Sequence, residues 1–251
     1  MEINFILPAC HHFRSPDSTL YINGFIPAQI AHNLCIVIIL NFISQDRGKH
    51  MRQPFDYIGY WEQEYRSGGT SGRGSYGVLA EFKAEVVNRL IQREGIQRVI
   101  EFGCGDGNQL QYMNYKDYLG VDVAASSVQR CASQYANDSS KSFMLYTPGL
   151  WINRGFLQAD LTVCLDVLYH ITDETDFRNT LHDVLHSSIA WVVLYTRLKE
   201  NGNPGIDTIQ DRNLFDYLFD YADFKVHEII PQRYPDQSSA DFVILRRIPS
   251  K

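Results

Sequence analysis

Residues 97–123 constrain the fold of this chain more than any other stretch. A short apolar run leads into a turn with three glycines, Gly103, Gly105 and Gly107, and a second apolar run then contains Asp122. Glycine lacks a Cβ and tolerates positive φ, so such a turn lets the backbone approach a ligand closely. Nucleotide-binding folds hold a ribose diol with a carboxylate that ends a second strand about 20 residues further on. The segment therefore predicts two parallel strands beside a bound nucleotide.

The spacing of the glycines separates two kinds of nucleotide site. The pattern is G-x-G-x-G, and Glu101 precedes the first glycine by two residues. The dinucleotide fingerprint is G-x-G-x-x-G and needs no such acid. Residues 101–107 instead resemble motif I of the class I S-adenosylmethionine (SAM) dependent methyltransferases. By this resemblance, the glycines and Cys104 wrap the methionine portion of SAM, Glu101 orients the loop, and Asp122 with Val123 holds the ribose. A tight turn without a ligand is the alternative.

Strands and helices alternate along the chain, which favours a parallel sheet covered on both faces. We expect strands at 98–102, 118–123, 142–146, 161–167, 190–195, 225–230 and 241–246. We expect helices at 78–91, 108–113, 126–135, 173–187 and 211–221. The last two strands have no helix between them, which predicts an antiparallel hairpin. A Rossmann-like, doubly wound α/β sheet of seven strands, mostly parallel with a C-terminal antiparallel hairpin, is also similar to the class I methyltransferase sheet.

The fourth expected strand ends in residues that are suited to the chemistry. Residues 160–170 have the form D-x-x-x-x-x-D-V-x-x-H, which is similar to the segment after motif II of the family. Strand ends at a topological switch point face the ligand crevice, so Asp166, Tyr169 and His170 should lie near the methyl group. His170 titrates in the range of a general base. We therefore predict His170 and Asp166 as catalytic, with Asp166 also contacting SAM; a packing role for His170 is equally compatible with the sequence.

The segment also lacks Asn/Asp-Pro-Pro-Tyr and Pro-Cys sequences. Their absence argues against methylation of adenine or glutamine amino groups and of pyrimidine C5. No acid follows the third expected strand, which leaves Tyr146 and Thr147 as candidates for adenine contacts.

Residues 60–77 resemble the opening of a bacterial methyltransferase subgroup that is associated with polysaccharide and secondary-metabolite genes. The shared pattern is Y-W-E-x-x-Y-x-x-G-G-x-S-G-x-G-S-Y-G. By this resemblance, Trp61 contacts SAM and residues 55–75 form a lid that excludes water; a disordered linker is the alternative. The subgroup's H-V-R-H stretch is absent from residues 206–212, so its acceptor specificity does not carry over. Arg233 and Tyr234 match the subgroup and are candidates for the acceptor site.

Residues 1–50 lack the periodicity of the rest of the chain. They are either an N-terminal extension or the product of an upstream start, with Met51 as the natural first residue, and residues 51–251 form the methyltransferase domain. The apolar run at 30–43 is shorter than the about 20 residues that a bilayer span needs. The N-terminal residues also lack the basic region with which a signal peptide begins. We expect no membrane span and a cytoplasmic protein.

The net charge of −6 disfavours a broad nucleic-acid-binding face. The five cysteines show neither a C-x-x-C pair nor a zinc spacing, so we expect free thiols and no metal. These observations predict a SAM-dependent methyltransferase that acts in line on a small-molecule or saccharide acceptor, at oxygen. A nicotinamide (NAD) oxidoreductase and a non-catalytic SAM-binding or partner-binding protein are the alternatives. The acceptor and the oligomeric state are not predicted.

Overall fold

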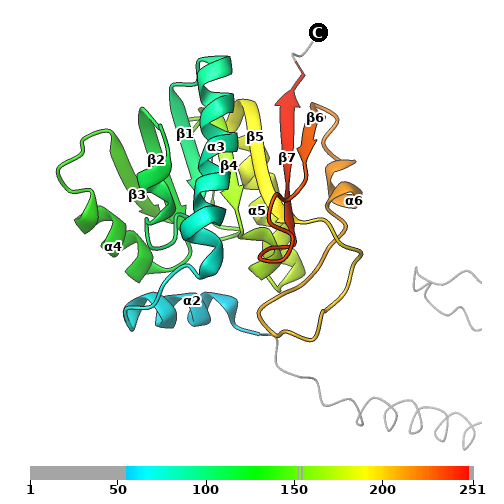
Figure 1. Ribbon diagram of the computed structural model, residues 1–251, viewed down its shortest axis with the longest axis horizontal. Helices are drawn as coiled ribbons and strands as arrows, with labels where there is room; N and C mark the ends of the chain where they lie inside the picture. The colour runs from blue at the N-terminus through cyan, green and yellow to red at the C-terminus, as the bar shows by residue number, and fades with distance from the viewer. Residues whose placement is uncertain (1–54, 152, 154, 249–251) are drawn as a thin grey trace, which may run out of the picture. The chain divides into compact units, whose positions relative to one another are not determined.

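Seven strands form one sheet in the part of the chain that the computed structural model describes, which comprises residues 55–151, 153 and 155–248. The strand order is β3-β2-β1-β4-β5-β7-β6 (Figure 1). The strands are β1 Arg98–Phe102, β2 Asp117–Asp122, β3 Lys141–Leu145, β4 Ala159–Leu165, β5 Ser188–Arg197, β6 Phe224–Ile230 and β7 Ala240–Arg247. The predicted extension at residues 1–50 lies outside the described residues, and its status stays a prediction.

The sheet is parallel except at its C-terminal strands. The neighbours β3, β2, β1, β4 and β5 all pair in parallel, whereas β7 pairs antiparallel with both β5 and β6. The predicted seven-stranded sheet with a C-terminal antiparallel hairpin is confirmed. β4 ends earlier than predicted, at Leu165, because Asp166 has a φ of 61° and cannot continue an extended strand.

Helices cover both faces of the sheet. Their bounds are α2 Tyr57–Arg66, α3 Gly77–Glu94, α4 Ala125–Gln134, α5 Glu174–His186 and α6 Leu214–Leu218. α3 ends where Gly95 takes the left-handed conformation, with a φ of 66°. α5 begins where the side chain of Asp173 accepts a hydrogen bond from the Asp176 amide at 2.9 Å.

Two predicted helices are shorter than expected. The segment at 108–113 contains only a 3₁₀ turn, Gln109–Tyr112. Gly107, two residues before this turn, has a positive φ, and β2 starts at Asp117, so the chain has room for little more. The segment at 211–221 is helical only from Leu214, because the backbone of Asp211 pairs with Gly202 in an isolated β-bridge.

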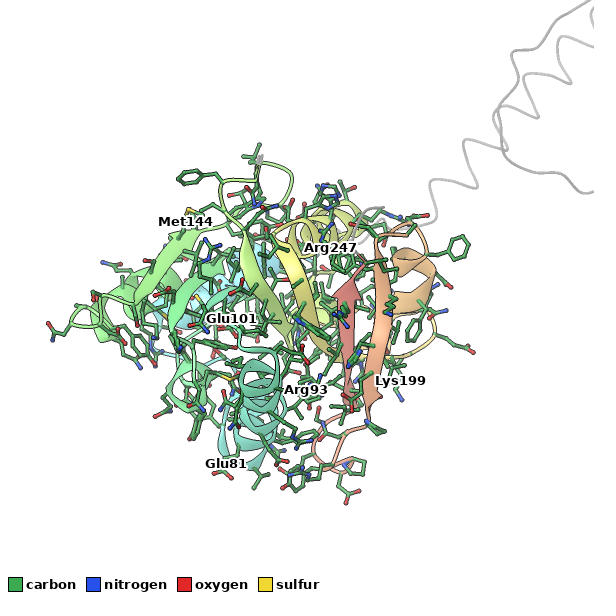
Figure 2. All side chains as sticks on the ribbon, turned by 90° about the horizontal axis from the view of Figure 1, so that it is seen from above. Glu81, Arg93, Glu101, Met144, Lys199 and Arg247 are labelled. Atoms are coloured by element: carbon green, nitrogen blue, oxygen red, sulfur yellow. The ribbon has the colours of Figure 1, made fainter. Side chains whose placement is uncertain are left out.

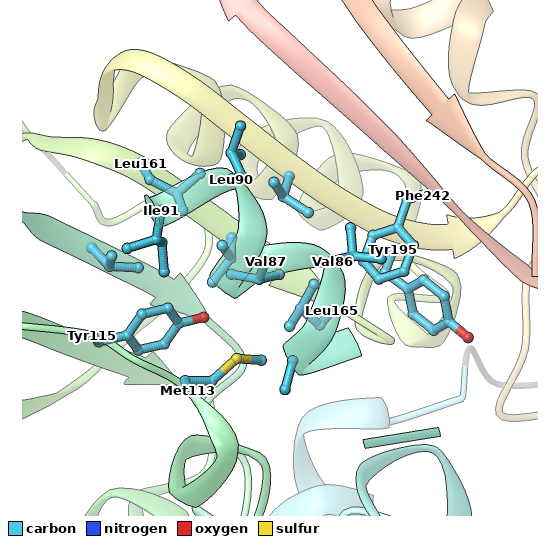
Figure 3. Packing of buried hydrophobic residues seen from close by; sticks show 14 of the residues in the cluster. Val86, Val87, Leu90, Ile91, Met113, Tyr115, Leu161, Leu165, Tyr195 and Phe242 are labelled. Carbon is cyan, nitrogen blue, oxygen red and sulfur yellow. The ribbon is translucent and has the colours of Figure 1, made fainter. Parts of the chain in front are cut away.

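Two apolar clusters attach the helices to the sheet. On one face, the apolar side of α3 packs against side chains of β4, β5 and β7 (Figure 3). The residues involved include Val86, Val87, Leu90, Ile91, Leu161, Leu165, Tyr195 and Phe242. On the other face, α5 packs against β1 and β5 through Phe177, Leu181, Leu185, Ile100 and Val192. Each fully buried large apolar side chain contributes about 1.5–3 kcal/mol, so this packing holds the sheet as a rigid support.

α2 lies across one end of this sheet (Figure 1). Hydrogen bonds from Ser126, at the start of α4, to Glu62 of α2 hold it there, with a distance of 3.0 Å from the Ser126 amide. In the described part of the chain, no helix has the length and apolar character to cross a membrane.

Candidate active site

A cavity of about 820 Å³, including its part open to solvent, lies at the carboxyl ends of β1, β2 and β4. Its wall combines aromatic and apolar side chains with a few converging polar groups, which is typical of ligand clefts. The predicted site residues that line it are Trp61, Glu101, Gly103, Cys104, Gly105, Asp122, Val123, Asp166 and His170. Gly107 and Tyr169 lie outside this lining. Of the two adenine candidates, Tyr146 lines the cavity, and Thr147 lies in a separate groove.

The glycine turn has a conformation that few other residues could adopt. Gly103, Gly105 and Gly107 have φ values of 84°, 56° and 77°. A Cβ on Gly103 would overlap the side chain of Val167, and a Cβ on Gly105 would overlap Ser71. The turn therefore brings backbone to the cavity wall and leaves no space there for side chains.

Asp122 is fixed at the end of β2. One carboxylate oxygen accepts a hydrogen bond from the Gly105 amide at 2.8 Å, and the other accepts one from the Ala124 amide at 2.9 Å. Burial raises the pKa of Asp122, although these backbone hydrogen bonds oppose the rise. Each carboxylate oxygen keeps a further lone pair, which a ribose hydroxyl could use.

Glu101 lies among the central strands of the sheet, whereas Glu81 of α3 lies at the margin of the molecule (Figure 2). Burial raises the pKa of Glu101 to about 7, although the hydrogen bond from the Tyr118 hydroxyl and the charge of Lys83 act in the opposite direction. The Tyr118 bond is 2.5 Å long. A positively charged ligand group beside Glu101 would lower its pKa further and favour the ionised carboxylate.

Asp166 takes part in a compact cluster. Lys83 donates to one carboxylate oxygen at 2.7 Å, and the Tyr169 hydroxyl donates to the other at 2.8 Å. Lys83 is 1% exposed and lies on α3, far from Asp166 in the sequence. Both carboxylate oxygens therefore already accept hydrogen bonds, which favours an anchoring role for Asp166 over that of a proton acceptor.

His170 lies in the 3₁₀ turn after β4. Its Nδ1 is 2.8 Å from the carbonyl oxygen of Thr208. A carbonyl can only accept, so Nδ1 carries the hydrogen and Nε2 keeps a lone pair. Burial lowers the pKa of His170, although the Thr208 bond opposes the effect. The ring meets Trp61 edge to face, with centroids 5.3 Å apart. A neutral imidazole with one free nitrogen can accept a proton.

The loop between α2 and α3 is hydrogen-bonded to the glycine turn. The Ser71 amide donates to Asp106 at 2.9 Å, and the Asp106 amide donates to the Ser71 hydroxyl at 2.8 Å. Arg130 of α4 donates to the Gly69 carbonyl at 2.8 Å. Burial opposes ionisation of Asp106, but hydrogen bonds, the largest from Tyr76, outweigh it and lower its pKa. These contacts hold the loop over the turn.

Comparison with known proteins identifies the family. The sequence model of a family described as "Methyltransferase domain" matches residues 77–225. The chain belongs to this methyltransferase family. A search of curated proteins found no match. The family match decides against the oxidoreductase alternative.

Solved structures show the same fold. The N-methyltransferase NodS from Bradyrhizobium japonicum WM9, in complex with S-adenosyl-L-homocysteine (SAH), has a TM-score of 0.61 and 15% identity, covering 77% of this chain and 100% of that one. The magnesium protoporphyrin IX methyltransferase (ChlM) from Synechocystis PCC 6803 with bound SAH has a TM-score of 0.53 and 15% identity, covering 78% and 96%. The chain thus has the fold of a class I SAM-dependent methyltransferase.

The residues of the methyltransferase cavity fit SAM. The glycine turn provides the close backbone approach, and Asp122 keeps the acceptor capacity for a diol. The sequence singled out neither Lys83 nor Gln109, and it gave no individual role to Ser71 of the lid segment or to Asp106 of motif I. All four residues also line the cavity. For Lys83 a signal existed, because it is a lysine among the apolar positions of an amphipathic helix.

The two acceptor candidates lie elsewhere. Arg233 pairs with Glu85 of α3 at 2.6 Å and stacks over Phe82, and the Tyr234 ring also packs against Phe82. Neither residue lines the cavity. The hydrogen-bonding and stacking capacity of Arg233 is thus used in holding the β6–β7 loop to α3.

Proposed function

We propose that this methyltransferase methylates a hydroxyl oxygen of a small-molecule or saccharide acceptor, with His170 as the general base. The observation that carries the proposal is the Nδ1 contact of His170 with the Thr208 carbonyl at 2.8 Å. It leaves Nε2 as the proton-accepting atom of a buried histidine whose pKa is lowered. Such a group is neutral at pH 7 and can accept the proton that a hydroxyl loses as its oxygen becomes a nucleophile.

The other residues hold the reactants in place. Bound SAM supplies an electrophilic methyl group, whose transfer needs alignment above all. We assign Gly103 and Gly105 to the methionine portion and Asp122 to the ribose hydroxyls. Asp166, held by Lys83 and Tyr169, anchors the end of β4 from which His170 follows.

Aromatic side chains separate the site from water. Tyr57, Trp61 and Tyr65 of α2 line the cavity, and the Trp61 and Tyr65 rings stack with centroids 5.7 Å apart. Together with the loop at 67–75, they form the lid in this proposal. Flat aromatic surfaces also suit the apolar faces of sugar rings or other small acceptors.

Binding and turnover test the proposal in sequence. Calorimetry with SAM, SAH and NAD should show binding of the first two alone; binding of NAD alone would contradict the cofactor assignment. Turnover is then measured with radiolabelled SAM and extracts of the source cell, fractionated into hydroxyl-containing and amine-containing acceptors. Labelled product in the hydroxyl fraction supports oxygen methylation. Product in the amine fraction alone would refute it, and binding without product in any extract would favour the non-catalytic alternative.

His170→Gln distinguishes a base from a packing residue, because glutamine keeps polar atoms but cannot accept a proton at neutral pH. General-base catalysis contributes about 10²–10⁴-fold, so we expect kcat to fall by about this factor while SAH affinity is retained. A variant with normal kcat would show that His170 only packs.

A further inference from the structure

Lys83 is the one lysine or arginine side chain among the described residues that line the cavity. It is 1% exposed, on the face of α3 that packs against the sheet. A buried ammonium group is costly unless ionic and hydrogen-bonding partners compensate it. Each N–H donor of the Lys83 ammonium group therefore needs a partner, either in the protein or in a ligand that occupies the cavity.

The contacts of Lys83 leave part of its capacity unused. An ammonium group has three donors. In the part of the chain that the structure describes, Nζ donates one hydrogen bond, to Asp166 at 2.7 Å, and otherwise lies 5.5 Å from the centre of the Tyr195 ring. Asp166 in turn also accepts from Tyr169. Lys83 can thus keep Asp166 as a partner and still donate to an anion in the cavity.

Gln109, which also lines the cavity, has a hydrogen-bond acceptor without a donor. It is 6% exposed, and its Nε2 donates to the Ala80 carbonyl at 3.0 Å. This bond fixes the orientation of the amide, because a flipped amide would place two acceptors together. Its Oε1 is buried and has no hydrogen-bond partner among the described residues. Gln109 is bonded to Ala80, and Ala80 and Lys83 are three residues apart on one side of α3. The Gln109 amide and the Lys83 ammonium group therefore belong to neighbouring parts of the cavity wall.

We propose that Lys83 and Gln109 bind the amino-acid end of SAM: Lys83 pairs with the carboxylate, and Gln109 Oε1 accepts a hydrogen bond from the α-ammonium group. This inference rests on the assignment of the cavity to SAM. A zwitterion provides the anion that Lys83 lacks and the donor that Gln109 lacks. Glu101 adds a carboxyl group beside the same end of the ligand.

The sheet order supports this direction of the ligand. β1 lies between β2 and β4. A molecule whose ribose is held by Asp122 at the end of β2 and whose other end passes the glycine turn after β1 reaches the end of β4. Asp166 and its partner Lys83 lie there. The charged end of the methionine portion thus comes to Lys83, the one lysine or arginine that the described residues contribute to the cavity wall.

Ligand truncation tests the inference without any mutation. Calorimetry compares SAH with decarboxylated SAH, with deaminated SAH and with 5′-methylthioadenosine, which lacks the whole amino-acid end. A hydrogen bond to a charged group is worth about a 10- to 100-fold change in Kd, so the wild-type protein should prefer SAH over each singly truncated ligand by about this factor. Equal affinity for SAH and decarboxylated SAH would overturn the role of Lys83.

Variants assign each preference to its residue. Lys83→Met should abolish the preference for the carboxylate and retain that for the amine, and Gln109→Met should do the reverse. Lys116→Met, which removes an exposed lysine outside the cavity, is the matched control and should change neither preference. Because Lys83→Met leaves Asp166 without its cation, the double variant Lys83→Met/Asp166→Asn is measured as well.

The outcomes separate this inference from the function it rests on. If Lys83 were only structural, its variants would weaken SAH and decarboxylated SAH equally, and the inference would be wrong although SAM binding stands. If the wild-type protein bound neither SAM nor SAH, the cofactor assignment and the inference would fail together.

Discussion

Replacement of Glu101 by glutamine should stabilise the ligand-free protein and weaken SAM binding. The pKa of this buried carboxyl group is about 7 in the folded chain, against an ordinary value of 4.5. Between these pH values the folded protein holds a proton that the unfolded chain releases. The free energy of unfolding of the wild-type protein therefore falls as pH rises through this interval.

The magnitude follows from the pKa difference. At about 1.36 kcal/mol per pH unit, the interval from 4.5 to about 7 amounts to about 3 kcal/mol. Glutamine has no charge and can still accept the hydrogen bond from Tyr118, so Glu101→Gln avoids this loss. The stability difference between the variant and the wild-type protein should grow by about 3 kcal/mol from pH 4.5 to 7 and stay constant at higher pH.

Urea denaturation from about pH 4.5 to 8 measures this difference. Glu81→Gln, which removes an exposed carboxylate of α3, is the matched control for the loss of one negative charge. Calorimetry should show weaker SAM binding by the Glu101 variant, because the carboxyl group faces the ammonium end of the ligand in our proposal. The wild-type protein should release a proton on binding near pH 7. A stability difference independent of pH would refute the assignment of a raised pKa to Glu101.

Three further predictions concern the base, the turn and the loop. The acidic limb of the pH–rate profile should lie below the usual histidine pKa of about 6.5, because burial lowers the pKa of His170, and it should vanish in His170→Gln; an unchanged limb in the variant would contradict the assignment. Gly105→Ala should cost about 1–3 kcal/mol of stability from its positive φ and lower SAM affinity, as denaturation and calorimetry would show; normal binding would exclude a close backbone approach. Ser71→Ala removes the hydroxyl that accepts a hydrogen bond from the Asp106 amide, so hydrogen exchange in residues 67–75 should increase and SAM should bind a few-fold more weakly. Unaltered exchange would show that this hydrogen bond does not hold the loop.

Local patterns were sufficient to predict the framework of the domain. The apolar run of β1, the three glycines and Asp122 lie within one short segment, so their conformation and spacing could be read along the chain. The hairpin of β6 and β7 was equally local, because no helix separates the two strands. The early end of β4 was not predicted, since nothing in the residue type of Asp166 indicates a φ of 61°.

The composition of the site depended on contacts between distant segments. The sequence alone determined the glycine turn and the residues that follow β2 and β4, because backbone preferences and strand periodicity act over a few residues. Only the tertiary structure decided that Lys83 pairs with Asp166 and that Ser71 bonds to Asp106. It also fixed the tautomer of His170, because Nδ1 donates to the carbonyl of Thr208 and Nε2 therefore keeps its lone pair. Periodicity shows which side chains are buried, whereas hydrogen bonds and pKa values depend on which buried groups come within a few ångströms of each other, and folding alone sets those distances.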